Sequence, residues 1–128
     1  MGMKEAVINV FNNYANFDGR ARRSEYWYFC LFNVLVGLVF GVLISLTKEG
    51  SILFRLFSGL EGLYNLAVLI PGLAVAWRRL HDIGKSGANW FWIFLPIAGA
   101  IMLIVWYCRE GDPGENAYGA DPKETERY

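Results

Sequence analysis

The residues of this chain that could do chemistry gather in one short polar stretch between two apolar runs. The stretch holds two arginines, the only histidine, an aspartate and a lysine: Arg78, Arg79, His81, Asp82 and Lys85. A histidine can act as an acid or a base, and an arginine can hold an anion. His81 and Asp82 are adjacent, however, and consecutive helical side chains point about 100° apart. They are therefore not a ready catalytic pair.

A second charged motif lies before the first apolar run and consists of Arg20, Arg22, Arg23 and Glu25. Clustered cations at a membrane surface attract anionic lipid headgroups by about 1 kcal/mol each. The same cations could instead set the orientation in the membrane and pair with Glu25 and Asp82. We predict at least one carboxylate–arginine pair between the two motifs. If the second span continues into the hinge as a helix, Arg78 and Asp82 are i,i+4 neighbours and can pair, and Glu25 can pair with Arg79 or with a neighbour in its own motif.

Other kinds of site are not indicated by the residue pattern. No nucleophile–base pair, metal-binding cluster or phosphate-binding loop is recognisable, so we expect no catalytic residue, no metal site and no cofactor. The formal net charge is zero, which gives no reason to expect binding to nucleic acid.

Three long runs of the sequence are apolar and carry almost no charge. Hydrophobic residues make up 55% of the chain and charged residues 19%, which favours a membrane protein over a small soluble domain. Since about 20 apolar residues cross a bilayer as a helix, we predict spans over 26–46, 57–77 and 90–107. Residues 1–128 would then form one all-α integral membrane domain with three transmembrane helices.

The segments around these spans are polar or amphipathic. Apolar residues recur at steps of three and four over 3–17 and predict an amphipathic interfacial helix or, alternatively, a helix packed on the protein's own surface. A cytoplasmic hinge over 78–89 would join the last two spans, and a polar, irregular, solvated tail would follow over 108–128. Pro71 and Pro96 are expected to bend the helices that contain them.

Three polar side chains fall inside the predicted spans: Asn33, Glu61 and Asn65. A carboxylate within the membrane often marks a transport pathway, although Glu61 could lie shallow enough to reach water. Small residues also repeat every four positions at Gly37, Gly41 and Ser45. Such a face lets another helix approach closely, and we expect it to pack within the chain rather than form a dimer.

The distribution of cations predicts the orientation. The N-terminal motif and the hinge place six cations near one membrane face: Arg20, Arg22, Arg23, Arg78, Arg79 and Lys85. The other face has Lys48, Arg55 and Arg109. Because cations favour the cytoplasmic side, we predict a cytoplasmic N-terminus and a periplasmic C-terminus. Cys30 and Cys108 would then lie on opposite faces, too far apart for an intrachain disulfide.

Three motifs of the chain resemble the signatures of one protein family. They are Phe17-Asp18-Gly19-Arg20-Ala21-Arg22-Arg23-Ser24-Glu25-Tyr26-Trp27, Arg78-Arg79-Leu80-His81-Asp82-Ile83-Gly84-Lys85-Ser86-Gly87 and Gly114-Glu115-Asn116-Ala117-Tyr118-Gly119-Ala120-Asp121-Pro122. The chain resembles a bacterial family of small inner-membrane proteins, domain of unknown function 805. The resemblance implies a multi-pass inner-membrane protein and no known reaction.

The functional interpretation follows from the charged motifs. We predict a non-enzymatic membrane module that binds anionic lipid headgroups or a partner protein through its basic cytoplasmic cluster. The alternative is a subunit of an oligomeric transporter or channel, since three helices are too few to enclose a pathway alone. An enzyme acting on a lipid-linked phosphate is a third possibility, with His81 as acid or base.

Overall fold

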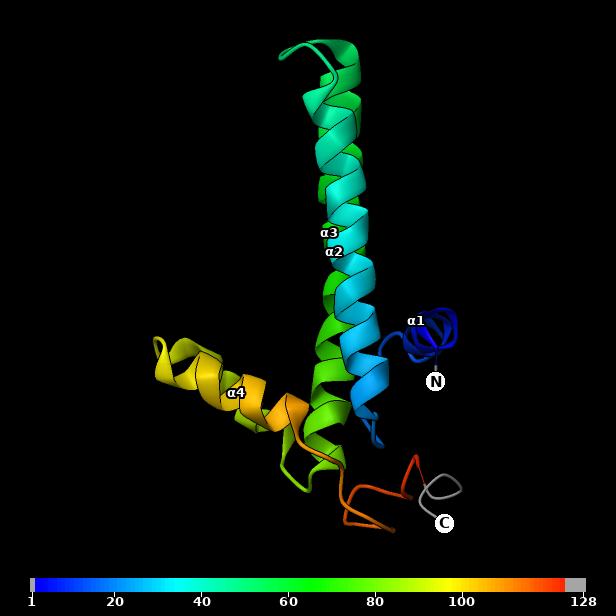
Figure 1. The fold of residues 1–128 in the computed structure, drawn as a ribbon, viewed down its shortest axis with the longest axis vertical. Helices are drawn as coiled ribbons and strands as arrows, with labels where there is room; N and C mark the ends of the chain where they lie inside the picture. Colours follow the sequence, from blue (N-terminus) through cyan, green and yellow to red (C-terminus); the bar gives the residue numbers. More distant parts are fainter. Residues whose placement is uncertain (1, 124–128) are drawn as a thin grey trace.

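The computed structural model describes residues 2–123, and its regular elements are helices (Figure 1). They are, in chain order, α1 (Met3–Asn12), α2 (Arg23–Ser45), α3 (Ile52–Asp82), the 3-10 helix η1 (Gly87–Phe94) and α4 (Ala98–Cys108). The helices α2 and α3 run side by side as one long hairpin. At the lower end of that hairpin in Figure 1, α1 lies to one side and the η1–α4 segment projects to the other. We call this lower end the hinge end.

The hairpin supplies the two elements that could cross a membrane. Within the described chain, α2 and α3 are the helices that are both long and apolar enough to do so. With 23 and 31 residues, they are about 34 Å and 46 Å long at 1.5 Å per residue. The predicted span 26–46 coincides closely with α2, and the predicted span 57–77 lies within α3. Ser51 begins α3 by accepting a hydrogen bond from the Phe54 amide at 3.2 Å.

The predicted third span over 90–107 is not a single helix. The 3-10 helix η1 ends at Phe94, the chain reverses over 95–97, and α4 follows with only 11 residues. Pro96 has no N–H to continue the helical bonding, and Ile97 has a φ of 62°, which turns the backbone. At about 16 Å, α4 is too short to cross a bilayer.

The predicted hinge over 78–89 is partly helical. Rather than ending at Trp77, α3 continues through Pro71 and past Trp77 to Asp82. Two residues after its end lies Gly84, whose φ of 74° is easily adopted only by glycine. The Lys85 amide then donates to the Leu80 carbonyl at 2.9 Å, as in a Schellman motif. Most of the charged hinge residues are therefore fixed on a helix.

The tail returns to the hinge end. The Asp112 amide donates to the Asp82 carbonyl at 2.7 Å, and Asp121 is buried. A tail packed on the hinge cannot lie on the opposite side of the membrane from it. The predicted separation of hinge and tail, which required three crossings, is therefore wrong. Cys30 and Cys108 are not disulfide-bonded, and they too lie in the half of the molecule that contains the hinge end.

The N-terminal helix α1 is shorter than the predicted 3–17. Its buried residues are Ala6 and Val10, whereas Phe11 and Tyr14 are exposed, and it packs against α2. The helix ends in a run of asparagines that bond locally. The Asn13 side chain donates to the Asn9 carbonyl at 2.8 Å, and the Asn16 side chain donates to Asn13 Oδ1 at 3.1 Å. Such bonds compete with continued helix.

The buried core lies at the hinge end rather than along the hairpin. Two apolar clusters form it: Ala76, Leu80, Ile83, Leu103 and Tyr107 in one, and Val10, Ala21, Phe29 and Val75 in the other. Farther along the hairpin, a Cβ added at Gly37 or Gly41 would meet no atom within 4 Å. The prediction that these small residues pack against another helix of the same chain is therefore wrong.

Candidate functional site

Asp82 is the centre of a buried polar cluster at the hinge end. Its Oδ1 accepts from Arg20 Nε at 2.9 Å, and its Oδ2 accepts from an Arg79 terminal nitrogen at 3.0 Å. All three side chains are at most 1% exposed. A buried carboxylate between two arginines is well paired, because each oxygen receives a charge-assisted hydrogen bond.

Arg20 joins Asp82 to the tail. Each of its three guanidinium nitrogens donates a hydrogen bond. Besides Asp82, the acceptors are the carbonyls of Gly114 at 2.6 Å, Gly119 at 3.3 Å and Asp112. The side chain therefore has no guanidinium nitrogen left for a ligand. It holds the tail on the end of α3.

Arg79 performs the same role at the end of α4. Its Nε donates to the Tyr107 carbonyl at 3.2 Å, and a terminal nitrogen donates to the Arg109 carbonyl. The Tyr107 hydroxyl is buried without a partner among the described residues. Burial, more than the nearby Cys30, raises the pKa of Tyr107, so this hydroxyl stays protonated.

A second buried pair ties α3 to the first two helices. A terminal nitrogen of Arg78 donates to Glu25 Oε1 at 2.9 Å, and both side chains are 4% exposed. The same oxygen accepts from the Asn9 side chain of α1 at 2.9 Å. Arg78 Nε donates to the Asn16 carbonyl at 3.1 Å. The pair thus connects α1, α2, α3 and the loop that follows α1.

His81 contacts two segments that are remote in sequence. Its Nδ1 donates to the Gly19 carbonyl at 2.9 Å, since a carbonyl can only accept. Its ring stacks on Tyr118 with 4.1 Å between centroids, and its own carbonyl accepts from the Asn116 side chain at 2.9 Å. Over residues 2–123, no three His, Cys, Asp or Glu side chains converge where a metal ion could bind.

The predicted link between the two charged motifs is confirmed, with different partners from those expected. Arg20 pairs with Asp82, and Arg78 pairs with Glu25. The predicted pairs of Arg78 with Asp82 and of Glu25 with Arg79 are not formed. Consecutive residues of a helix point about 100° apart, so Arg79 is directed at the tail and Arg78 at α1. We call the buried residues Arg20, Glu25, Arg78, Arg79, His81 and Asp82 the clamp.

The other three predicted site residues lie outside the clamp. Arg23 pairs with Glu110, and their side chains are 41% and 45% exposed. Lys85 Nζ lies 4.6 Å from the centre of the Trp106 ring, a cation–π contact typical of an interface. Arg22 is partly exposed at the start of α2. The predicted site therefore divides into a buried clamp and an accessible basic rim.

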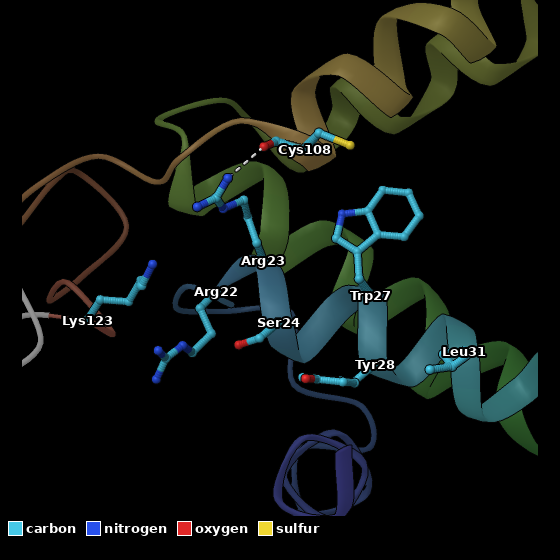
Figure 2. Close-up of a pocket in the computed structure, with 8 residues that line it drawn as sticks. All are labelled: Arg22, Arg23, Ser24, Trp27, Tyr28, Leu31, Cys108 and Lys123. Carbon is cyan, nitrogen blue, oxygen red and sulfur yellow. Dashed lines mark hydrogen bonds between the residues drawn. The ribbon is translucent and has the colours of Figure 1, made fainter. Parts of the chain in front are cut away.

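An open cleft of about 630 Å³ lies beside this rim (Figure 2). Its lining combines three cations with aromatic and aliphatic side chains: Arg22, Arg23, Ser24, Trp27, Tyr28, Leu31, Cys108 and Lys123. In Figure 2 the cations gather at the start of α2, and Trp27 and Leu31 follow along the helix toward its apolar part. Ser24 Oγ is buried without a partner in the described part of the chain.

The polar residues of the predicted spans lie away from the clamp. Asn33 Oδ1 accepts from the Tyr64 hydroxyl at 2.7 Å, and its Nδ2 donates to the Phe29 carbonyl at 2.9 Å. Asn33 and Asn65 line one groove between α2, α3 and η1. Glu61 is partly exposed and does not line that groove.

Sequence reasoning missed the tail as part of the site. The tail supplies carbonyls to Arg20, the Tyr118 ring to His81, and the buried Asp121, which accepts from the Gly114 amide at 3.0 Å. Its composition is that of a solvated segment, which is why it was predicted to be one. The signal that could have found it was the third family motif, over 114–122.

Comparison with known proteins agrees with the three motifs. The family model described as "Protein of unknown function (DUF805)" matches residues 14–120. The chain is 44% identical over 121 residues to the inner membrane protein YhaI of Escherichia coli (strain K12), which covers 91% of this chain and 93% of that protein. It is 42% identical over 121 residues to the inner membrane protein YhaH of the same strain, with 91% and 94% covered. No solved structure matches significantly. The chain therefore belongs to the DUF805 family.

Proposed function

We propose that this chain is a non-enzymatic module of the bacterial inner membrane that binds anionic phospholipid at its hinge end. The observation that carries the proposal is the cleft at the start of α2. Its cations, Arg22, Arg23 and Lys123, lie beside Trp27 and Leu31. A phospholipid offers the matching pair of groups, an anionic headgroup and an apolar chain.

The composition of the clamp supports a structural rather than a catalytic role for the buried residues. The guanidinium nitrogens of Arg20 and Arg79 all donate to Asp82 or to main-chain carbonyls. His81 is held between Gly19 and Tyr118. These residues position the rim, and the rim meets the lipid.

The cations also support an orientation with the hinge end in the cytoplasm. Among residues 2–123, six cations outside the clamp lie at this end: Lys4, Arg22, Arg23, Lys85, Arg109 and Lys123. The opposite end of the hairpin has Lys48 and Arg55. Since cations near span ends favour the cytoplasm, the N-terminal helix, the hinge and the tail all face it. The inner membrane is indicated by the names of YhaI and YhaH. A C-terminal reporter that is active only in the cytoplasm should be active, and an inactive reporter would contradict this orientation.

Lipid retention in nanodiscs tests the proposed binding. The protein is reconstituted in phosphatidylcholine with a minor fraction of phosphatidylglycerol, and retained lipid is counted by native mass spectrometry. The double variant Arg22→Gln/Lys123→Gln removes two charges at about 1 kcal/mol each, so phosphatidylglycerol should bind roughly 30-fold more weakly. The control Lys48→Gln/Arg55→Gln removes the same charge at the opposite end and should retain it. Equal retention in both variants would refute binding at the cleft.

A further inference from the structure

The η1–α4 segment is apolar on nearly all sides, yet it is not a spanning helix. It leaves the hinge end, reverses over 95–97 and returns to the hinge end (Figure 1). The reversal is close-packed, because a Cβ at Gly99 would approach the Trp92 carbonyl oxygen to 1.7 Å. The segment is thus a tight hairpin in its own right, and we call it the short hairpin.

One narrow face of the short hairpin is covered by the protein. Leu103 and Tyr107 pack with Leu80 of α3 in the core, and Gly99 faces η1. The large apolar side chains elsewhere are exposed: Phe91, Trp92, Ile93, Phe94, Leu95, Ile97, Ile101, Ile104 and Val105. They come from both limbs and from the turn. A helical element that is apolar all round is at home in hydrocarbon and not at a water-facing surface.

The backbone of the turn is also largely compatible with lipid. Irregular backbone within a membrane must satisfy its own polar groups. The Leu95 amide donates to the Trp92 carbonyl at 2.9 Å, the Ala98 amide donates to the Pro96 carbonyl at 2.6 Å, and Pro96 has no N–H, so the Ile97 amide is the one amide of the 95–98 turn without a backbone acceptor in the described chain. Ile97 is 79% exposed at a φ of 62°, where glycine would be less strained. A bulky apolar side chain kept at a strained position favours an apolar environment around it.

Two contacts locate the short hairpin relative to the long one. The contact of Lys85 with the Trp106 ring marks the boundary between polar and apolar residues at the base of the short hairpin. On the other limb, Trp90 lines the groove between α2 and α3 together with Val68 and Leu69. These two residues lie roughly 12 Å along α3 from Trp77, well inside the apolar part of the helix. The limb η1 therefore leaves the hinge against the last turns of α3, where the Phe91 ring lies 6.2 Å from that of Trp77, and the short hairpin projects from there to the side of the long one (Figure 1).

We infer that the short hairpin is a re-entrant element, inserted into the acyl-chain region of the hinge-side leaflet and returning to the same face. Its occupant is lipid because its exposed surface is as apolar as that of the candidate spanning hairpin, where Leu66 and Leu69 are 69% and 63% exposed. A protein partner would cover a single apolar face, whereas here apolar side chains are exposed on both limbs and on the turn. The inference does not depend on headgroup binding at the cleft.

Depth measurement along the short hairpin tests the inference. Single cysteines at 91, 94, 97, 101 and 104, in full-length protein carrying Cys30→Ser and Cys108→Ser, are spin-labelled in lipid vesicles. Accessibility to oxygen relative to a water-soluble nickel complex reports depth. We expect the ratio of oxygen to nickel accessibility, and so the depth, to be greatest at 94–97 and to decrease toward both 91 and 104. A steady change from 91 to 104 would indicate a third span, and a uniformly shallow profile would indicate a surface helix. Spin labels that neither oxygen nor the nickel complex can reach would indicate a protein partner. Each of these three results would overturn the inference.

A second measurement leaves both native cysteines in place and needs no spin label, because its probe is the fluorescence of Trp92. The part of the tryptophan fluorescence that is lost in Trp92→Phe should be quenched by lipids brominated along the acyl chain and should be insensitive to aqueous iodide. Quenching by iodide instead would overturn the inference.

Discussion

The clamp makes a sharp prediction for the substitution Asp82→Asn. The side chain keeps its shape but loses its charge, and one of its two oxygens becomes an amide donor. Arg20 and Arg79 would then remain buried, 1% and 0% exposed, without a counter-charge. Breaking a buried ion pair by removing one partner costs about 3–5 kcal/mol. Two arginines share this one carboxylate, so we expect a loss in the upper half of that range.

The assay is thermal unfolding of the purified protein in mild detergent, followed by circular dichroism. For a chain of this size the expected loss lowers Tm by roughly 10 °C or more. Glu110→Gln is the matched control, because it also neutralises one carboxylate that pairs with an arginine. Glu110 pairs with both Arg23 and Lys123 at the surface, where the side chains of Glu110, Arg23 and Lys123 are 45%, 41% and 24% exposed, so the cost should stay under about 1 kcal/mol.

The comparison of the two variants decides the role of Asp82. If Asp82→Asn and Glu110→Gln lower Tm by the same small amount, the clamp does not hold the hinge end together. The assignment of these residues to structure rather than to a ligand would then be refuted.

Three further substitutions test packing. Gly111→Ala should destabilise strongly, since its Cβ would lie 2.0 Å from an Asp82 oxygen; unchanged Tm would show that the tail is not held there. Gly41→Ala should leave monomer stability unchanged, because nothing lies within 4 Å, and a large loss of Tm would reveal an unrecognised contact. Tyr107→Phe removes a buried hydroxyl with no partner among residues 2–123 and should leave Tm unchanged or raise it slightly; a marked decrease would mean that the hydroxyl is bonded.

The sequence was informative where charge and periodicity coincide. The long hairpin followed from two apolar runs that carry little charge, and the buried pairing followed from the opposite charges of two motifs. The individual partners could not be predicted. On one helix Arg78 and Arg79 are both within reach of Asp82, at i,i+4 and i,i+3. Which of them pairs with it depends on the partners that α1, α2 and the tail offer, and Arg78 is taken by Glu25.

The third apolar run shows where such reasoning fails. A run without a polar face has no periodicity to distinguish one spanning helix from two short limbs. Pro96 predicted a bend, but the reversal also needs the backbone of Ile97 and the close approach at Gly99. These are conformational details that composition does not contain. The error in the number of crossings then placed the tail on the wrong side of the protein.

The contacts of Arg20 also constrain the order in which the molecule can be assembled. Its partners are Asp82 and the carbonyls of residues 112, 114 and 119, which are near the end of the chain. During synthesis the long hairpin is complete before these residues have been made. The arginines of the first two motifs are therefore unsheltered while the hairpin inserts, when their charge can hold that end on its own side. The tail can close over Arg20 and Arg79 only after the hairpin has been made, and the charges of these two arginines are then internal.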